Sequence, residues 1–80
     1  MKYFVYILEC ADKTLYCGYT NDLAKRILHH NTSKLGAKYT SGRRPVTLVY
    51  EESFDTLNES LKREMEIKKL PRIKKLALFS

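Results

Sequence analysis

The first twenty residues contain two apolar segments separated by a short polar one. The run YFVYILE at 3–9 is mostly apolar, β-branched or aromatic, which predicts a strand buried on both faces. The segment LYCGYT at 15–20 has a similar character and predicts a second strand. The polar residues 11–14 between them predict a turn, so the two strands are expected to pair as an antiparallel hairpin.

The rest of the chain shows apolar residues at helical spacing around one further strand. The elements expected there are a helix that begins after Thr20 or Asn21 and ends near His30, a strand over 46–50, a helix that begins at Asp55 with an apolar core stripe at Leu57, Leu61 and Met65, and a short helix that begins at Pro71. The basic residues 32–45 are expected to form a surface loop. The order β-β-α-β-α-α predicts an α+β fold, with a small three-stranded antiparallel sheet flanked by helices.

The length and composition limit the classes of protein to be considered. Eighty residues predict a single domain over 1–80 with a small core, and 44% hydrophobic with 30% charged residues is typical of a globular domain. The longest apolar run, at 3–8, is too short for a membrane-spanning helix or a signal peptide. Two cysteines, Cys10 and Cys17, are too few for a disulfide scaffold, so a reducing, cytoplasmic setting is expected.

The net charge of +6 is unevenly distributed. Residues 23–50 carry six basic and no acidic residues, and residues 61–80 carry seven basic and two acidic ones. The acidic segment 51–60 separates these two blocks. This distribution suggests a positive face suited to a polyanion such as a nucleic acid. A charged surface that only keeps the protein soluble is the alternative.

Glu64 is a carboxylate at a position where the helical pattern expects a core residue. On a helical wheel of about 100° per residue, Leu57, Leu61 and Met65 fall at about 0°, 40° and 80°, and Glu64 falls at about −20°. A carboxylate at the edge of a core face needs a partner or a bound cation, because its desolvation is unfavourable. The alternative to a metal or catalytic role is an ordinary i,i+4 ion pair with Lys68.

Arg26 and His30 are four residues apart on the first expected helix, so they project from one face. That spacing suits a pair that grips one phosphate, with arginine as a forked donor and histidine as an acid, a base or a donor. Two solvent-exposed polar residues are the alternative. His29 projects in another direction and is assigned no role.

Tyr6 and Tyr16 lie on the two strands of the expected hairpin. If Glu9 pairs with Leu15, Tyr6 lies opposite Gly18, and Tyr16 lies diagonally across the same face. A strand glycine there would leave room for a phenol and a ligand, although a bulge or simple core packing of the tyrosines is the alternative. Three further tyrosines are interpreted as packing residues: Tyr3, Tyr19 and Tyr50.

The loop between the first helix and the third strand combines an aromatic residue with closely spaced cations. Lys38, Tyr39, Arg43 and Arg44 could follow a phosphate backbone while the tyrosine stacks on a base or a sugar. Lys25, on the first helix, is a further candidate contact to nucleic acid.

The order of these residues resembles that of the GIY-YIG nuclease superfamily. The two name-giving tripeptides stand as Val5-Tyr6-Ile7 and Tyr16-Cys17-Gly18, and Arg26, His30 and Glu64 follow in the same order. The runs RILHHN at 26–31, AKYTSGRRP at 37–45 and LKREMEIKKL at 61–70 resemble the small stand-alone bacterial subfamily, which consists of little beyond the catalytic domain.

The resemblance implies hydrolysis of phosphodiester bonds in DNA, in repair or recombination, with RNA left open as a substrate. It implies one divalent ion, Mg²⁺ or Mn²⁺, with Glu64 as the sole protein ligand, and it gives Arg26 the role of neutralising charge on the phosphate. Tyr6 or Tyr16 would orient and deprotonate the attacking water. Tyr6 is preferred as the base and Tyr16 as a phosphate-orienting donor, with His30 as a proton relay.

Two other functions are compatible with the same fold. One is a catalytically silent nucleic-acid-binding module, and the other is a protein-interaction domain whose basic face meets an acidic partner. The chain is expected to act as a monomer and to have no contact with a membrane.

Overall fold

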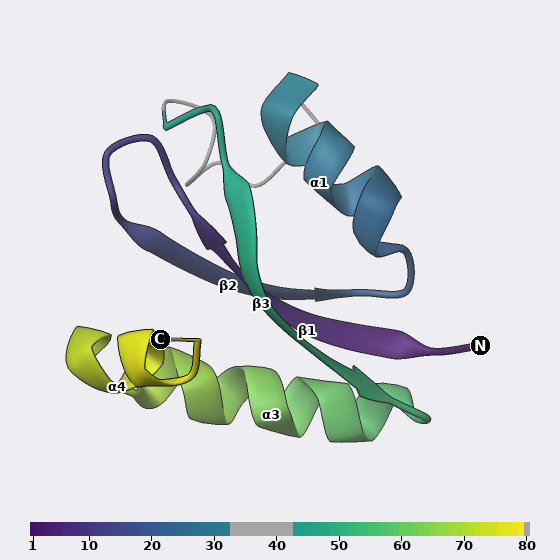
Figure 1. Cartoon of the computed structure of the whole chain (residues 1–80). Helices are drawn as coiled ribbons and strands as arrows, with labels where there is room; N and C mark the ends of the chain where they lie inside the picture. Colours follow the sequence, from purple (N-terminus) through teal and green to yellow (C-terminus); the bar gives the residue numbers. More distant parts are fainter. Residues whose placement is uncertain (33–42, 80) are drawn as a thin grey trace.

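The computed structural model of the protein describes residues 1–32 and 43–79. The elements in chain order are β1 (Tyr3–Glu9), β2 (Leu15–Thr20), α1 (Leu23–Thr32), β3 (Thr47–Phe54), α3 (Leu57–Lys69) and α4 (Arg72–Ala77), as Figure 1 shows. The predicted α+β class and the order β-β-α-β-α-α are therefore confirmed. The expected basic loop falls mainly outside the described residues.

The three strands form one antiparallel sheet in the order β2-β1-β3. The central strand, β1, is buried on both faces, and this explains why the apolar run at 3–9 shows no alternation. Glu9 pairs with Leu15, and Tyr6 pairs with Gly18, which confirms the register expected from the hairpin.

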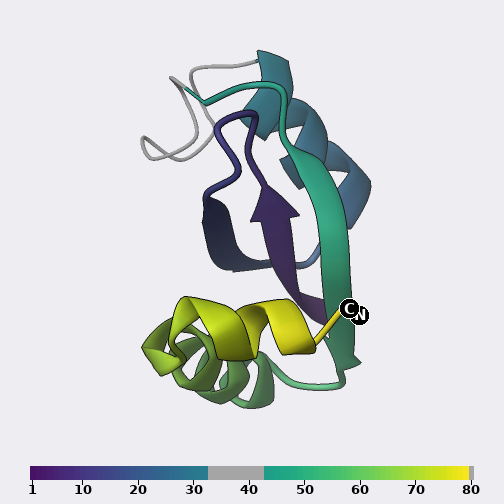
Figure 2. The same ribbon diagram turned by 60° about the vertical axis from the view of Figure 1, so that its left-hand side comes forward.

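Helices cover both faces of the sheet (Figures 1 and 2). On one face, Tyr6 and Leu8 pack with Leu23 and Ile27 of α1. On the other face, a second apolar cluster joins alternate strand residues to Ile67 of α3 and to the end of the chain: Val5, Ile7, Cys17, Leu78 and Phe79. The alternation of β1 side chains thus divides the small core into two layers.

The first helix begins later than the sequence suggested, and its cap is a different residue. The Asp22 carboxylate accepts a hydrogen bond from the backbone N–H of Lys25 at 3.1 Å, which is the geometry of an N-cap. The Thr20 hydroxyl is instead engaged with the backbone N–H of Asp22 at 3.1 Å. The prediction of Thr20 or Asn21 as the cap was therefore wrong by one or two residues.

The third strand is longer than predicted, and the next helix begins two residues later. β3 continues to Phe54 because it is the edge strand, where polar residues alternate between solvent and the sheet. The cap of α3 is Thr56, whose hydroxyl accepts a hydrogen bond from the backbone N–H of Glu59 at 3.2 Å. Asp55 pairs instead with Lys2.

The apolar stripe predicted for α3 was wrong in part. Leu57 is 41% exposed and Met65 is 56% exposed, whereas Ser60 and Ile67 are the buried residues of this helix. The helix is therefore rotated so that the Ser60–Ile67 side faces the sheet. On the helical wheel Glu64 lies about 40° from Ser60 and about 60° from Ile67, so it borders the buried face.

Candidate active site

A cavity of about 350 Å³ lies at the β2 edge of the sheet. Its walls come from β1, β2, α1 and α3, and the lining residues are Tyr6, Tyr16, Gly18, Tyr19, Thr20, Arg26 and Glu64. Four of the five predicted catalytic residues line this cavity, which we call the active-site cavity. The fifth, His30, lies behind Tyr6 and contacts it directly.

The position of β2 at the sheet edge explains how Glu64 meets the two tyrosines. Tyr6 and Tyr16 belong to the layer covered by α1, whereas Glu64 is on α3, which packs on the opposite face. A central strand would separate these groups. At an edge, side chains from both faces can approach one another around a single strand, and Gly18 is the β2 residue at that point.

Gly18 provides space that no other residue would leave. A Cβ atom at this position would lie 2.6 Å from Tyr6 Oη, 2.8 Å from Tyr6 Cζ and 3.1 Å from Tyr16 Cε2. The pairing of β1 with β2 is regular there, and the glycine has no positive φ. The bulge considered as an alternative is therefore not the reason for this glycine. It allows the Tyr6 phenol to lie over β2.

The Tyr6 hydroxyl is buried between two nitrogen groups. Its oxygen lies 3.1 Å from Nε2 of His30, and Nε of Arg26 donates to it over a longer distance of 3.4 Å. Burial raises the pKa of Tyr6 to about 12, although the hydrogen bond from Arg26 opposes that shift. The phenol is therefore neutral at pH 7 and keeps a proton to donate.

His30 is a neutral imidazole at pH 7. Burial, followed by the positive charges of Arg26 and Arg44, lowers its pKa to about 4. Since Arg26 donates to the Tyr6 oxygen, the phenol proton can point to Nε2 of His30, which then accepts it. This pattern assigns the second ring proton of His30 to Nδ1.

Tyr16 completes an aromatic cluster and is more accessible than Tyr6. Its ring centroid lies 5.2 Å from that of His30 and 6.4 Å from that of Tyr6. The residue is half-buried and lines the cavity. Tyr16 therefore has the position of a group that faces a ligand, and Tyr6 that of a group held behind it.

Tyr19 was interpreted as a packing residue, and this was wrong. It is 43% exposed and lines the active-site cavity. On β2 its side chain alternates with those of Gly18 and Thr20, so it projects towards the face that carries α3.

Glu64 is a nearly buried carboxylate in the cavity wall. Its side chain is 12% exposed and pairs with Lys68, whose Nζ lies 3.5 Å from Oε2. The i,i+4 pair considered as the ordinary alternative is thus present. The Lys68 side chain is half exposed, however, so this pair leaves the carboxylate at the cavity wall.

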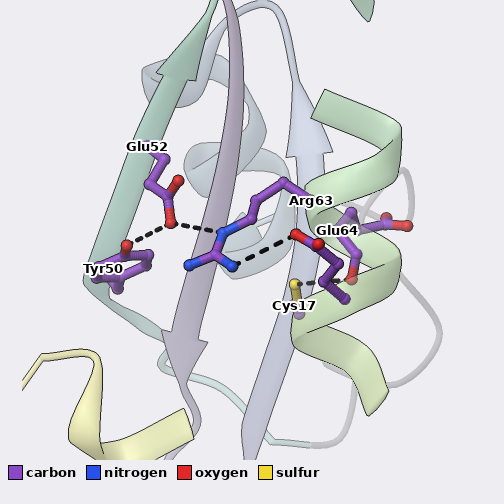
Figure 3. Close-up of polar contacts among 6 residues, drawn as sticks. Cys17, Tyr50, Glu52, Arg63 and Glu64 are labelled. Carbon is purple, nitrogen blue, oxygen red and sulfur yellow. Dashed lines mark hydrogen bonds and ion pairs between the residues drawn. The ribbon is translucent and has the colours of Figure 1, made fainter. Parts of the chain in front are cut away.

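The neighbour of Glu64 anchors α3 to the far edge of the sheet. Arg63 Nε donates to Oε2 of Glu52 on β3 at 2.9 Å, and the Tyr50 hydroxyl donates to the same oxygen. Arg63 also lies 3.4 Å from Glu66. Figure 3 shows Arg63 extending across the sheet to Glu52, whereas Glu64 lies on the β2 side of the helix.

The sequence reasoning missed this anchor. Side chains alternate along β3, which places Tyr50 and Glu52 on one face. This pattern could have indicated the contact between Tyr50 and Glu52, but not the one with Arg63. The partner on α3 is eleven residues further along the chain, at a distance that no local pattern indicates.

The end of α1 is held by two contacts that the sequence reasoning also missed. The Asn31 side chain forms two hydrogen bonds to the backbone of Val46, accepting from its N–H at 2.7 Å and donating to its carbonyl at 3.1 Å. Arg44 Nε donates to the backbone carbonyl of His30 at 2.7 Å. Both contacts fix the last turn of α1 and therefore the His30 ring.

The predicted nucleic-acid contacts are not gathered in one place by the described residues. Lys25 is exposed on α1. Arg43 pairs with Asp12 at 2.9 Å, and Arg44 holds the end of α1. Lys38 and Tyr39 lie outside the described residues, so their contact with nucleic acid stays a prediction.

Cys17 belongs to the core and not to the chemistry of the cavity. Its Sγ is directed to the backbone carbonyl of Glu64, 4.0 Å away, as Figure 3 shows. Burial, followed by the charge of Glu64, raises the pKa of the thiol to about 11. The thiol is therefore protonated at pH 7 and is a poor nucleophile.

A three-stranded antiparallel sheet with two tyrosines, an arginine and a glutamate around one edge cavity defines the nuclease-type fold that the sequence resembles. The model of the family described as the GIY-YIG catalytic domain matches residues 2–76. The chain therefore belongs to the GIY-YIG family, whose members are generally endonucleases. Within the described residues, no helix is long and apolar enough to cross a membrane.

Relatives of similar length occur in several organisms. The chain is 57% identical to a UPF0213 protein of Staphylococcus saprophyticus, over 99% of this chain and 95% of that one. It is 53% identical to a UPF0213 protein of Halobacterium salinarum, over 94% and 96%. These names state no activity.

The fold is also that of two solved relatives. The solution NMR structure of a UPF0213 protein from Bacillus halodurans is 47% identical, with a TM-score of 0.62 over 98% of this chain and 82% of that one. That of a protein from E. faecalis is 40% identical, with a TM-score of 0.64 over 94% and 79%.

Proposed function

We propose that this protein is a divalent-metal-dependent endonuclease that hydrolyses phosphodiester bonds in DNA. The observation that carries the proposal is the convergence of Tyr6, Tyr16, Arg26 and Glu64 on one cavity of about 350 Å³, from four different elements. Membership of the GIY-YIG family supports it, because that family is generally one of endonucleases.

The cavity suits a hard cation that keeps most of its water. Glu64 is the carboxylate of its lining, and no group of three or more His, Cys, Asp or Glu side chains that could hold a metal occurs within 1–32 and 43–79. Mg²⁺ and Mn²⁺ accept one or two carboxylates together with waters and phosphate oxygens. Glu64 would therefore be the sole protein ligand. When bound, the ion would polarise the phosphate and stabilise the leaving oxygen.

Arg26 would bind the scissile phosphate. Its guanidinium group lines the cavity and contacts the Tyr6 hydroxyl through Nε, which orients the side chain towards the site. A guanidinium group offers five N–H donors in a planar fork that matches phosphate oxygens. Arg26 would thus neutralise the negative charge that develops on the phosphate during hydrolysis.

Tyr6 and His30 would move the proton of the attacking water. Tyr6 Oη would accept that proton and pass its own to Nε2 of His30, 3.1 Å away. A phosphate bound against Arg26 would favour this transfer. The negative charge of the phosphate would offset the positive charge of Arg26, which is one of the charges that lower the pKa of His30. Tyr16, at the accessible side of the cluster, would donate its hydroxyl to a phosphate oxygen.

The wider features of the protein agree with a small enzyme that acts on nucleic acid. The net charge of +6 favours a polyanionic substrate, and a role in repair or recombination would suit an endonuclease. We place its activity in one domain that acts as a monomer in the cytoplasm, where the buried thiols of Cys10 and Cys17 would stay reduced.

A cleavage assay with purified variants tests the proposal. Wild-type protein is expected to cleave plasmid or branched DNA with Mg²⁺ or Mn²⁺ and to be inactive with EDTA. Glu64→Ala and Arg26→Ala are each expected to abolish cleavage, whereas Lys62→Gln, an exposed change on the same helix as Glu64, should not. Equal cleavage by all preparations would contradict the proposal, because it would indicate a contaminating nuclease.

A further inference from the structure

A second cavity of about 200 Å³ lies beside the active-site cavity, where β2 turns into α1. Its lining residues are Thr20, Asn21, Asp22, Lys25, Arg26 and His29. Two of them, Thr20 and Arg26, also line the active-site cavity. The two cavities are therefore neighbours along one surface, and a ligand could extend from one into the other.

The second cavity has the side chains of an anion site. Lys25 and Arg26 bring two positive charges, and His29 brings a ring nitrogen. Lys25 and His29 are four residues apart on α1, so both project from the same side of the helix. His29, to which the sequence interpretation assigned no role, is part of this lining.

The acidic residue of this cavity is already engaged. Asp22 Oδ1 accepts a hydrogen bond from the backbone N–H of Lys25 at 3.1 Å. The Thr20 hydroxyl accepts from the backbone N–H of Asp22 at 3.1 Å and lies 3.3 Å from its carbonyl. These contacts hold the β2–α1 turn in shape. They direct the Asp22 carboxylate towards the helix end, where it compensates the helix dipole.

We infer that this second cavity binds the phosphate that is next to the scissile one on the same nucleic-acid strand. The inference rests on the proposed function. Arg26, shared by the two cavities, lies between the scissile phosphate and its neighbour, while Lys25 and His29 contact the neighbour alone. The substrate is then a strand with at least two successive phosphates. A single nucleotide diester would fill only the active-site cavity.

Chromogenic substrates test this inference because they define which bond is cleaved. Two p-nitrophenyl diesters of thymidine are compared, one with a single phosphate and one extended by a second thymidine and its phosphate. Both the 5′ and the 3′ series are made, so that the extension lies on either side of the scissile bond. Wild-type protein is expected to show a kcat/KM about tenfold higher for the extended substrate in one of the two series.

The gain in that series should depend on the second cavity. Lys25→Gln and His29→Gln are expected to abolish most of it, so that the ratio of kcat/KM between the extended and the single-phosphate substrate falls close to one. Lys62→Gln removes the same charge from an exposed position on α3 and should keep the full gain. A gain that survives in Lys25→Gln and His29→Gln, or no gain in either series, would overturn the inference.

A binding measurement separates failure of the inference from failure of the proposed function. With EDTA present, fluorescence anisotropy of a labelled single-stranded oligonucleotide gives the salt dependence of Kd without cleavage. Each lost phosphate contact lowers the slope of log K against log salt by about 0.7 on single strands. Lys25→Gln should show this decrease and Lys62→Gln should not. Equal slopes would overturn the inference, and a decrease without hydrolysis of any substrate would overturn only the nuclease assignment.

Discussion

The phenol oxygen of Tyr6 lies 3.1 Å from Nε2 of His30, and both side chains are buried, Tyr6 in the wall of the active-site cavity and His30 behind it. The contact joins the first strand of the sheet to the last turn of α1. It gives the phenol proton a defined acceptor, because Arg26 supplies the other hydrogen bond to the same oxygen. This contact supports our proposal that Tyr6 is the proton-transferring residue.

We expect the two members of this pair to act as a unit. Tyr6→Phe and His30→Gln should each lower kcat for DNA cleavage by about 10²-fold, because proton transfer by a positioned side chain contributes on that order. The double variant should lose little more than either single one. Kinetics of all three variants check this, and losses that multiply in the double variant would show that the residues act independently.

The stability of the fold should depend on pH through His30. Its pKa is about 4 in the folded protein and about 6.5 in the unfolded chain, so the unfolded state binds the proton more readily. The contribution is therefore fully present above pH 6.5 and is lost as the pH falls towards 4. Between pH 7.5 and 4.5 the loss is about 2–3 kcal/mol.

Urea unfolding at these two pH values measures that loss. The free energy of unfolding of wild type should decrease by more than that of His30→Gln, and the difference between the two decreases reports His30 alone. Identical decreases in the two proteins would show that the imidazole is not held in its neutral form by the fold.

Substitution of Gly18 should damage both stability and activity. Gly18→Ala introduces an atom 2.6 Å from Tyr6 Oη, so the phenol must move, at a cost of about 1–3 kcal/mol in the free energy of unfolding. Cleavage should fall together with stability, because the displaced phenol leaves His30.

The same substitution in the Tyr6→Phe background provides the control. The closest contact is then absent, so Gly18→Ala should destabilise that protein less than wild type, as measured by thermal or urea unfolding. An equal effect in both backgrounds would mean that the hydroxyl is not what the glycine accommodates.

Much of this arrangement follows from the sequence, and the exceptions have identifiable physical reasons. The hairpin register that pairs Tyr6 with Gly18 is fixed by the short turn, and it was predicted correctly. The rotation of α3 was not predicted correctly. Apolar residues at helical spacing indicated a core stripe through Leu57 and Met65, whereas the helix buries Ser60 and Ile67. Tertiary packing decides how a helix is rotated against a sheet, and a polar residue such as Ser60 does not indicate from the sequence that it is buried.

The long-range polar contacts could not be read from the sequence for a different reason. The ion pair of Glu52 with Arg63 joins an edge strand to a helix, and its two residues show no common periodicity. The Asn31 contact to Val46 imitates backbone pairing with a side chain. Both depend on elements that are brought together only in the folded chain.

The Arg63–Glu52 ion pair should hold Glu64 in place through α3. Both side chains are about one-quarter to one-third exposed, and the pair is reinforced by the Tyr50 hydroxyl. Arg63→Leu should destabilise the protein by about 1–3 kcal/mol, because it leaves Glu52 partly buried without its cation. It should also weaken Mn²⁺ binding at Glu64.

The double variant separates this pair from a general loss of charge. Glu52→Leu with Arg63→Leu should be more stable than Arg63→Leu alone, because no unpaired charge is left. Urea unfolding measures the stabilities and Mn²⁺ titration measures the affinity. Additive destabilisation by the two substitutions would show that the ion pair contributes nothing.

The central claim is that Glu64, together with Tyr6 and Arg26, forms a metal-assisted active site, and Mn²⁺ broadening of the amide signals of the folded protein tests it most directly. With Mn²⁺ far below the protein concentration, the nearest amides broaden first. We expect broadening centred on Gly18 and Glu64 in wild type and its disappearance in Glu64→Gln. Broadening centred on the acidic segment 51–60 would contradict the assignment, as would broadening at Gly18 and residue 64 that is unchanged in Glu64→Gln.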